Sequence, residues 1–600
     1  GRSIGGVDLV NGGTEVSGGG DRLILDYADA NSSLQGGYNY EVGAADAGEF
    51  TNQVKFAEIE RLQIVGSQFS DTIRAGGGDD FINAGMGNDT VFTGQGNNSV
   101  NADDGNDTVV HFNDAFGNVF YTPAPATETM SWINGGAGID TFSGNLVHED
   151  DDVVLTSLDP EVENPGQVFT TSNGSVIHGF ERFQDMQTGG GDDQLTQLGR
   201  VDNDFRTGAG DDIVNTGLGL DYADGGIDGP GIGLLPAQGD DLLVVDYSVG
   251  DIGDGMKSEI NYNAALPSRY YRTANNGAVQ WDEVEFVNFE RVQVDGTQHS
   301  DMIVGVDGDD ELRGHDGKDS ISGRIGNDQI FGGDDDDAIM GGRGNDIMHG
   351  GRGNDVIIDD VNEDNDQGGD DQLFGDDGND WLFGAGGNDE LQGGNGNDVM
   401  IGGAGNDSLN GGADNDIIIG VNWGGEVFPA VPEIDTMTGG TGADFFILGD
   451  GVFPYYDDAQ LVTSGGQHQA IITDFSLEEG DAIALHGDAS DYALQESGGS
   501  TRILRTGGVP ELIGTLEGVT GLDLNSDAFQ YFDDEVDPET IGLLLPAVQQ
   551  VREAASQETI SVNDFKVLPE TEAVLVGLLL PAVQQAREAA PATTFDVNKL

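Results

Sequence analysis

The sequence predicts an all-β solenoid built from stacked nine-residue repeats, and three observations support this fold class. A nine-residue period runs from Gly296 to Ile419 and is interrupted only at Asp359–Asn365. The sixth residue of every repeat is aspartate and the eighth is a large apolar residue. Glycine supplies 98 of the 600 residues, about twice its usual share. Because both columns stay in register, a disordered low-complexity tract explains the sequence poorly.

Each column of the repeat has a physical reason. Glycines at the first, second and fourth positions let the backbone adopt positive φ and bring carbonyl oxygens close to one point. The aspartate adds a carboxylate, which completes the all-oxygen shell that Ca²⁺ prefers. The last three residues alternate outward, inward and outward like a short strand. One apolar residue in nine is too little for an ordinary core, so we expect stacked turns and bound metal to supply the remaining stability.

Composition excludes several classes of partner. Lys and Arg number 23 against 109 Asp and Glu, a formal net charge of -86. Nucleic acid and anionic membranes are therefore not expected partners, because both need a basic surface. The chain has no cysteine, so neither disulfides nor thiolate metal sites can hold it together. No apolar run approaches the roughly 18 residues of a membrane span. Because the chain starts at Gly1 without Met or a signal peptide, we expect a processed protein or a piece of a longer one.

The repeats resemble a known family. GGRGNDIMH at 341–349 and GGNGNDVMI at 393–401 are similar to the nonapeptide GGxGxDxUx of the RTX calcium-binding proteins. The resemblance implies a right-handed parallel β-roll with two nonapeptides per turn and many Ca²⁺ ions held between turns on both edges. It also implies a bacterial protein that is secreted unfolded and folds in extracellular calcium.

We expect the aspartates at position six to be the metal ligands. The main roll, 296–419, supplies thirteen of them: Asp301, Asp310, Asp319, Asp328, Asp337, Asp346, Asp355, Asp371, Asp380, Asp389, Asp398, Asp407 and Asp416. An earlier block and isolated copies add Asp71, Asp80, Asp89, Asp107, Asp140, Asp193, Asp212 and Asp444. Asn98 holds the same position in the earlier block, and we expect a weaker site there because the amide lacks the charge. The acidic insertion at Asp359–Asp366 is either a further ion site or a solvated loop.

The distribution of repeats predicts a modular chain with a cap. The cap is expected at 448–532, where alternating apolar strands follow the last repeat, because an uncovered roll end would be an adhesive edge. Ahead of it we expect a first repeat module with a strand insertion, a second degenerate module, and a third module that contains the main roll, at 1–133, 134–234 and 235–447 respectively.

The last segment, 533–600, differs in character. It contains IGLLLPAVQQVREAA at 541–555 and VGLLLPAVQQAREAA at 576–590. Proline in the first turn followed by strong helix formers predicts two short amphipathic helices. Helices this short need a docking surface, in the same chain or in a neighbour. The motif resembles a segment that follows the hydrophobic stem in prepilin-like proteins of planctomycetes, although the cleavage region that normally precedes it is missing.

No catalytic motif emerges. None of the eight histidines has the spacing of a His-Glu-x-x-His zinc site. The G-x-S-x-G at Gly1–Gly5 lacks a preceding strand, and carboxylates are too common to be diagnostic of glycosidase chemistry.

We therefore expect an extracellular or cell-surface structural or adhesive protein without enzymatic activity. It is expected to fold on Ca²⁺, to contact a cell surface or matrix, and to assemble with itself through the tail into a filament or layer. The alternative is a non-catalytic RTX module that serves the secretion and folding of a secreted hydrolase.

Overall fold

The chain is built almost entirely from β-strands in the computed structural model. The only helical element in its described residues is the 3-10 turn η1 (Ala489–Asp491). The structure describes residues 8–11, 22–26, 35–38, 48–50, 54–57, 61–75, 79–94, 98–111, 132–135, 140–144, 153–156, 168–171, 176–178, 180, 182–184, 186–188, 191–197, 202–226, 240–248, 255–260, 267–274, 279–359, 369–421, 433–449, 455–456, 468–507 and 510–532. The two predicted LLPAVQQ helices lie outside these residues.

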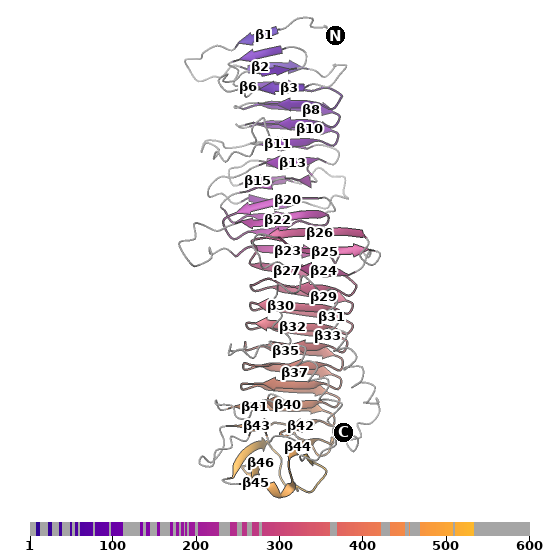
Figure 1. Ribbon diagram of the computed structural model, residues 1–600, viewed down its shortest axis with the longest axis vertical. Helices are drawn as coiled ribbons and strands as arrows, with labels where there is room; N and C mark the ends of the chain where they lie inside the picture. Colours follow the sequence, from indigo (N-terminus) through magenta and orange to yellow (C-terminus); the bar gives the residue numbers. More distant parts are fainter. Residues whose placement is uncertain are drawn as a thin grey trace. The chain divides into compact units, whose positions relative to one another are not determined.

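The chain divides into two compact units. One comprises 1–246 and 263–293, and the other comprises 247–262 and 294–600. The second unit contains the main roll, where successive strands alternate between two parallel sheets (Figure 1).

The first sheet of the roll contains the even-numbered strands: β24 (Met256–Glu259), β28 (Met302–Val304), β30 (Ser320–Ile325), β32 (Ala338–Arg343), β34 (Val356–Ile358), β36 (Trp381–Phe383), β38 (Val399–Gly403), β40 (Ile417–Val421), β42 (Phe445–Ile447), β44 (Ala482–His486) and β48 (Phe529–Phe532). The second sheet contains β29 (Glu311–Asp316), β31 (Gln329–Asp334), β33 (Ile347–Arg352), β35 (Gln372–Asp377), β37 (Glu390–Asn395), β39 (Ser408–Ala413), β41 (Ile434–Thr441) and β43 (Gln469–Ile472). The predicted parallel β-roll is confirmed.

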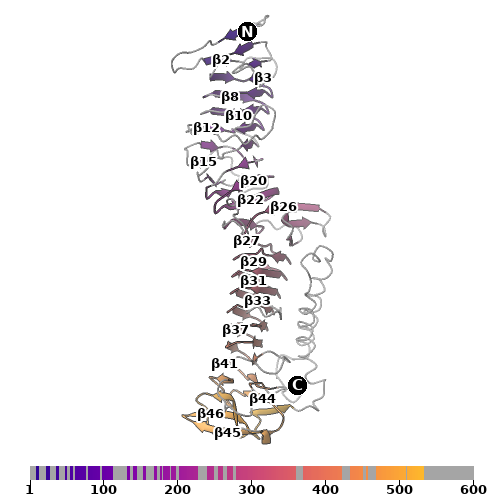
Figure 2. The same ribbon diagram turned by 60° about the vertical axis from the view of Figure 1, so that its left-hand side comes forward.

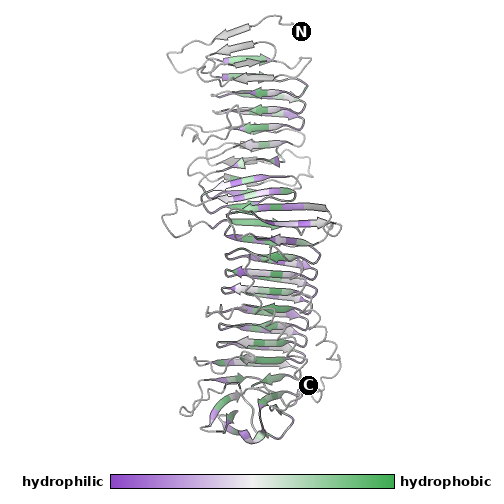
Figure 3. Cartoon of the chain, in the orientation of Figure 1, coloured by the Kyte–Doolittle hydropathy of each residue, from purple (hydrophilic) through white to green (hydrophobic). Residues whose placement is uncertain are grey.

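The pairing register confirms two nonapeptides per turn. Leu312 pairs with Ile330, and Ile330 pairs with Met348, each 18 residues further on. Stacking thus places every position-eight side chain on the one below, and these side chains are buried throughout the roll. They make a continuous apolar ladder between the two sheets, visible as the green centres of successive strands in Figure 3.

The interruption at Asp359–Asn365 leaves the ladder intact. Met348 pairs with Leu373, which is 25 residues further on, so the ladder continues across the seven extra residues. The frame then resumes, because Leu373 pairs with Leu391 at the usual spacing of 18.

Backbone geometry explains the glycine columns. Gly344, at position four of its repeat, has φ +130°, and a Cβ there would lie 1.7 Å from the carbonyl oxygen of Gly326. The turns stack backbone on backbone, which only glycine permits at this point. At position two the requirement is conformational, and His315, Arg324 and Ala385 also adopt positive φ there.

A β-rich region follows the roll, as expected for the cap. Strands β45 (Tyr492–Ser497), β46 (Ser500–Arg505) and β47 (Glu511–Leu516) form an antiparallel meander, of which Figure 2 labels β45 and β46. Strand β47 also pairs in parallel with β43 of the roll. Phe475 lies 6.3 Å from Phe446, ring centre to ring centre. The apolar ladder continues beyond Phe446, because Phe446 pairs with Ile483 and Ile483 pairs with Phe529.

The first unit repeats the same architecture with more insertions. Two parallel stacks contain β2 (Arg22–Asp26), β6 (Arg61–Val65), β8 (Phe81–Met86), β10 (Ser99–Asp104), β12 (Trp132–Asn134) and β16 (Val176–His178), and β3 (Gln35–Tyr38), β7 (Thr72–Arg74), β9 (Thr90–Phe92), β11 (Thr108–His111), β13 (Thr141–Gly144) and β17 (Arg182–Phe183). Two shorter parallel series follow: β18 (Met186–Gln187), β20 (Asp204–Gly208), β22 (Leu220–Gly226) and β26 (Val279–Val287); β19 (Gln194–Thr196), β21 (Ile213–Asn215) and β23 (Leu242–Asp246).

Antiparallel strands form the insertions of this unit. They are β4 (Gly48–Phe50) with β5 (Val54–Ala57), β14 (Val153–Thr156) with β15 (Val168–Thr171), and β25 (Ser268–Ala274) with β26. Strand β1 (Asp8–Asn11) pairs in parallel with β5, and β27 (Arg291–Asp295) lies at the sequence boundary of the two units. No helix in the described part of the chain is long and apolar enough to cross a membrane.

Candidate metal centre

The position-six aspartates form two rows along the main roll, one at the start of each sheet's strands. The first row contains Asp301, Asp319, Asp337, Asp355, Asp380, Asp398, Asp416 and Asp444, and the second row contains Asp310, Asp328, Asp346, Asp371, Asp389 and Asp407. In the first unit, Asp71, Asp89, Asp107 and Asp140 form one row and Asp193 and Asp212 another, while Asp80 is followed by Asn98. All 21 predicted aspartates are buried.

One carboxylate oxygen of each aspartate is fixed by the backbone of the preceding turn. The Asp319 N–H donates to Asp337 Oδ1 at 2.8 Å, and the Asp398 N–H donates to Asp416 Oδ1 at 2.9 Å. This bond recurs from turn to turn, because the same residue type returns at the same register position. It holds each carboxylate in one orientation without neutralising its charge.

The second oxygen of most aspartates has no such donor. Within the described residues, Oδ2 is buried and lacks a hydrogen-bond partner in Asp89, Asp107, Asp319, Asp328, Asp337, Asp355, Asp380, Asp389, Asp398, Asp407 and Asp416. A buried carboxylate oxygen without a partner is costly. Its recurrence at one position of the repeat indicates that a bound cation is part of the folded state.

Glycine at position one leaves the space that such a cation needs. A Cβ on Gly323 would lie 2.1 Å from Asp328 Oδ2 and 2.8 Å from the carbonyl oxygen of Gly341, one turn further on. Gly393 has the same surroundings, because a Cβ on it would lie 2.3 Å from Asp398 Oδ2 and 2.6 Å from the carbonyl oxygen of Gly411. Carboxylate and carbonyl oxygens thus converge where a side chain would otherwise stand, which is the donor set that fits Ca²⁺.

Burial has a large effect on the acidity of these groups. It raises the pKa of Asp337 to about 9 and that of Asp398 to about 7, from an ordinary value of 3.8. Backbone donation from the preceding turn lowers both pKa values, and like charges raise them, in Asp337 those of Asp319 and Asp355. At neutral pH a cation would have to compete with protons for these oxygens.

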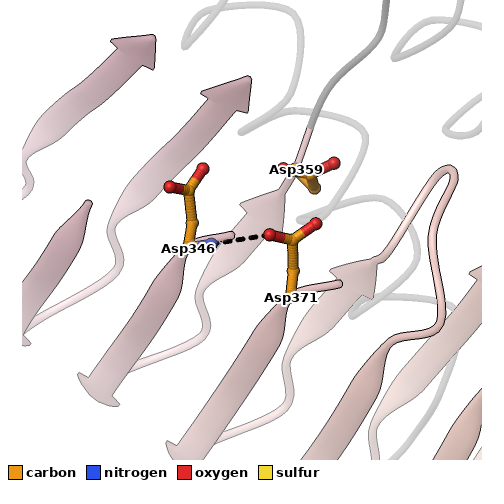
Figure 4. Close-up of side chains that lie close together, drawn as sticks. All are labelled: Asp346, Asp359 and Asp371. Atoms are coloured by element: carbon orange, nitrogen blue, oxygen red, sulfur yellow. Dashed lines mark hydrogen bonds between the residues drawn. The ribbon is translucent and has the colours of Figure 1, made fainter. Parts of the chain in front are cut away.

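At Asp359, the structure distinguishes between the two alternatives for the acidic insertion, a further ion site or a solvated loop. Asp359 is fully buried, and its carboxylate lies with those of Asp346 and Asp371 in a group whose ligand atoms are all within 4.8 Å of one another (Figure 4). Asp359 is therefore not part of a solvated loop. Three carboxylates at this distance have the donor atoms to hold a divalent cation.

Sequence reasoning missed several members of the rows. Asp435 follows Asp407 and Asp481 follows Asp444, with the preceding backbone N–H donating to Oδ1 at 2.9 and 3.1 Å. Asp241 follows Asp212 in the same way. The sequence carries one signal for these residues, an aspartate two positions before an apolar residue, as in Asp435-Thr-Met437. The glycines that normally precede the aspartate are absent there.

Asn98 is a natural substitution at the ligand position. Its Oδ1 accepts from the Asp80 N–H at 3.1 Å, as an aspartate would, while its Nδ2 donates to the Gly94 carbonyl oxygen at 3.4 Å. The amide thus donates to a carbonyl group of its own repeat, and the weaker metal site expected at Asn98 stays a prediction.

Comparison with known families agrees with this geometry. A model of the RTX calcium-binding nonapeptide repeat matches residues 63–91, 85–110, 295–330, 322–357, 365–391, 392–421 and 432–452. The chain carries RTX calcium-binding repeats. RTX repeats bind Ca²⁺ in multiple copies, and the assignment of the position-six carboxylates as its ligands stays a prediction. No curated protein is significantly similar to the chain, and the planctomycete resemblance of the tail stays a prediction.

The raised pKa values predict how pH acts on the calcium-free protein. An aspartate whose pKa rises on folding binds more protons in the folded than in the unfolded chain. The free energy of unfolding without calcium should therefore fall as pH rises from about 4 to about 9. In chelator, circular dichroism should show more β-structure at pH 5 than at pH 8. Equal spectra at the two pH values would contradict this assignment of the buried charge.

The glycine cradle predicts a sharp steric effect. Gly323→Ala places a methyl group against Asp328 Oδ2 and should cost about 1–3 kcal/mol in the free energy of unfolding, with weaker calcium binding. The matched control is Gly507→Ala, where a Cβ meets nothing within 4 Å and stability should be unchanged. Thermal unfolding in saturating calcium measures both variants, and equal unfolding temperatures would show that the space is not required.

Proposed function

We propose that this chain is an extracellular structural protein that folds on Ca²⁺ and associates with further copies of itself. The rows of buried carboxylates with an unpartnered oxygen support this proposal most directly. One apolar residue per nonapeptide contributes little hydrophobic stabilisation, so ion binding provides a large part of the folding free energy.

The requirement for many ions favours a location outside the cell. Extracellular calcium modules typically bind with dissociation constants of about 10⁻⁴–10⁻³ M. A chain with such sites stays unfolded where calcium is scarce and folds where calcium is abundant. This behaviour fits a protein that is exported before it folds and then serves as a structural or adhesive component at a cell surface or in a matrix.

Charge couples calcium binding to association. A net charge of -86 keeps copies of the chain apart. Calcium bound along the rows lowers that charge and permits contact between copies. The tail supplies an attractive element, because apolar residues recur in both LLPAVQQ copies, at Leu543–Leu545 and Leu578–Leu580, where they need a covering partner.

Loss of a single ligand should be measurable. Asp398→Asn removes the charge of a buried carboxylate in an uninterrupted part of the first row, so isothermal titration calorimetry should show fewer calcium ions bound at saturation. Asp316→Asn, at an exposed aspartate at the end of β29 in the second sheet, should keep the parent stoichiometry. Unchanged stoichiometry in Asp398→Asn would mean that the position-six column does not bind calcium.

Deletion of 533–600 tests the role of the tail. The truncated protein should still bind calcium but should remain monomeric in light scattering, whereas the full chain should associate when calcium is added. Association of the truncated protein would place the contacts between copies on the roll or its insertions.

A further inference from the structure

The second row ends at an aspartate whose two oxygens both have protein donors. Asp435 Oδ1 accepts from the Asp407 N–H at 2.9 Å, like the earlier members of the row from Asp328 onward. Its Oδ2 accepts from the Tyr456 hydroxyl at 2.5 Å. Both side chains are buried, so the hydroxyl serves this carboxylate alone, away from water.

In the preceding turn, by contrast, the second oxygen of the aspartate has no protein donor. Asp407 Oδ2 is buried and, in the described part of the chain, has no hydrogen-bond donor. A Cβ on Gly402 would lie 2.4 Å from that oxygen and 2.6 Å from the carbonyl oxygen of Gly420. This is the arrangement found beside the other glycines at position one.

One turn later, the tyrosine takes the equivalent place. A Cβ on Gly420 would lie 2.4 Å from Asp435 Oδ2 and 2.1 Å from the Tyr456 hydroxyl oxygen. The hydroxyl thus lies where the carbonyl oxygen of the next turn lies elsewhere. The hydroxyl donates a hydrogen bond to the carboxylate, whereas the carbonyl oxygen is a further acceptor and cannot donate to it.

The row has no acidic successor beyond this point. Strand pairing places Ala470 of β43 next to Asp435 of β41. An ion at Asp435 would therefore lack the carboxylate that the following turn supplies elsewhere in the row. A neutral donor satisfies the last oxygen without such a partner.

The other row ends also use protein donors. At the C-terminal end of the first row, the Ser476 N–H donates to Asp481 Oδ2 at 2.7 Å. At the N-terminal ends, the Thr297 N–H donates to Asp301 Oδ2 at 2.5 Å and the Val306 N–H donates to Asp310 Oδ2 at 2.7 Å. Thr297 and Val306 hold position two, where the later repeats have residues with positive φ.

We propose that Tyr456 closes the second row without metal, its hydroxyl donating to Asp435 in place of Ca²⁺, so that Asp407 is the last carboxylate of this row to bind an ion. The inference rests on the proposed calcium-dependent function and specifies at which aspartate the second row of ion sites ends. By the same reasoning, Asp301, Asp310 and Asp481 mark row ends that protein N–H groups satisfy.

A matched pair of variants of the full chain tests the proposal. Native mass spectrometry of the calcium-saturated protein counts bound ions. Asp407→Asn should bind at least one ion fewer than the parent, and Asp435→Asn should bind the parent number. A loss of one ion in both variants would overturn the assignment of Tyr456. No loss in either variant would instead contradict calcium binding by the row itself.

A second variant covers the case in which Asp435→Asn does not fold. Tyr456→Phe keeps the ring and removes only the donor, so its unfolding temperature should fall while its calcium count stays at the parent value. A count raised by one would also support the proposal, since the vacated position would then accept an ion. A count lowered by one would overturn it, because the hydroxyl would then be part of a metal site.

Discussion

A buried carboxylate oxygen that no protein group satisfies is the constraint on which the roll depends. The fold fixes one oxygen of most position-six aspartates with a backbone N–H from the turn before, as the Asp319 N–H does for Asp337. It then leaves the other oxygen in a space bounded by glycine and a carbonyl group. Without a cation, every turn adds an uncompensated buried charge or a proton held at a raised pKa.

This constraint explains the rest of the repeat. Position one is usually glycine in the main roll, because a Cβ there would meet the carboxylate and a carbonyl oxygen, as the surroundings of Gly323 show, whereas Ala75, Ala84 and Thr93 hold the same position in the first unit. Position four is usually glycine because the preceding turn lies close, as at Gly344, although Asp335 and Asp414 hold this position with positive φ. One apolar residue per repeat, at position eight, is enough because the two sheets share a thin core. Insertions are tolerated between turns, since the ladder from Met348 to Leu373 continues across one.

Much of this could be read from the sequence, because a solenoid repeats its local chemistry at a fixed spacing. Stacked turns with an inner apolar ladder follow from columns such as Asp328 and Ile330, whereas the parallel roll with two repeats per turn was expected from the resemblance to RTX proteins. Asp435 was missed because it lies in a degenerate repeat, and only the register with Asp407 reveals it. Asp359 could not be assigned, because its approach to Asp346 and Asp371 depends on the path of an insertion.

Tyr456 shows most clearly what the repeat pattern cannot predict. It lies 21 residues from Asp435 in a segment without repeats, and a lone tyrosine carries no signal of its partner. The contact arises from tertiary packing next to Gly420, not from local pattern. Repeats therefore predict where ion sites recur, while the places where they stop depend on contacts that the pattern does not contain.

Amide hydrogen exchange, read by mass spectrometry with and without calcium, tests the central claim most directly. If calcium compensates the buried carboxylates, strands β29 to β41 should be strongly protected in saturating calcium and should exchange rapidly in chelator at neutral pH. Equal protection of these strands in both conditions would show that the roll is stable with its carboxylates uncompensated, and would contradict the account.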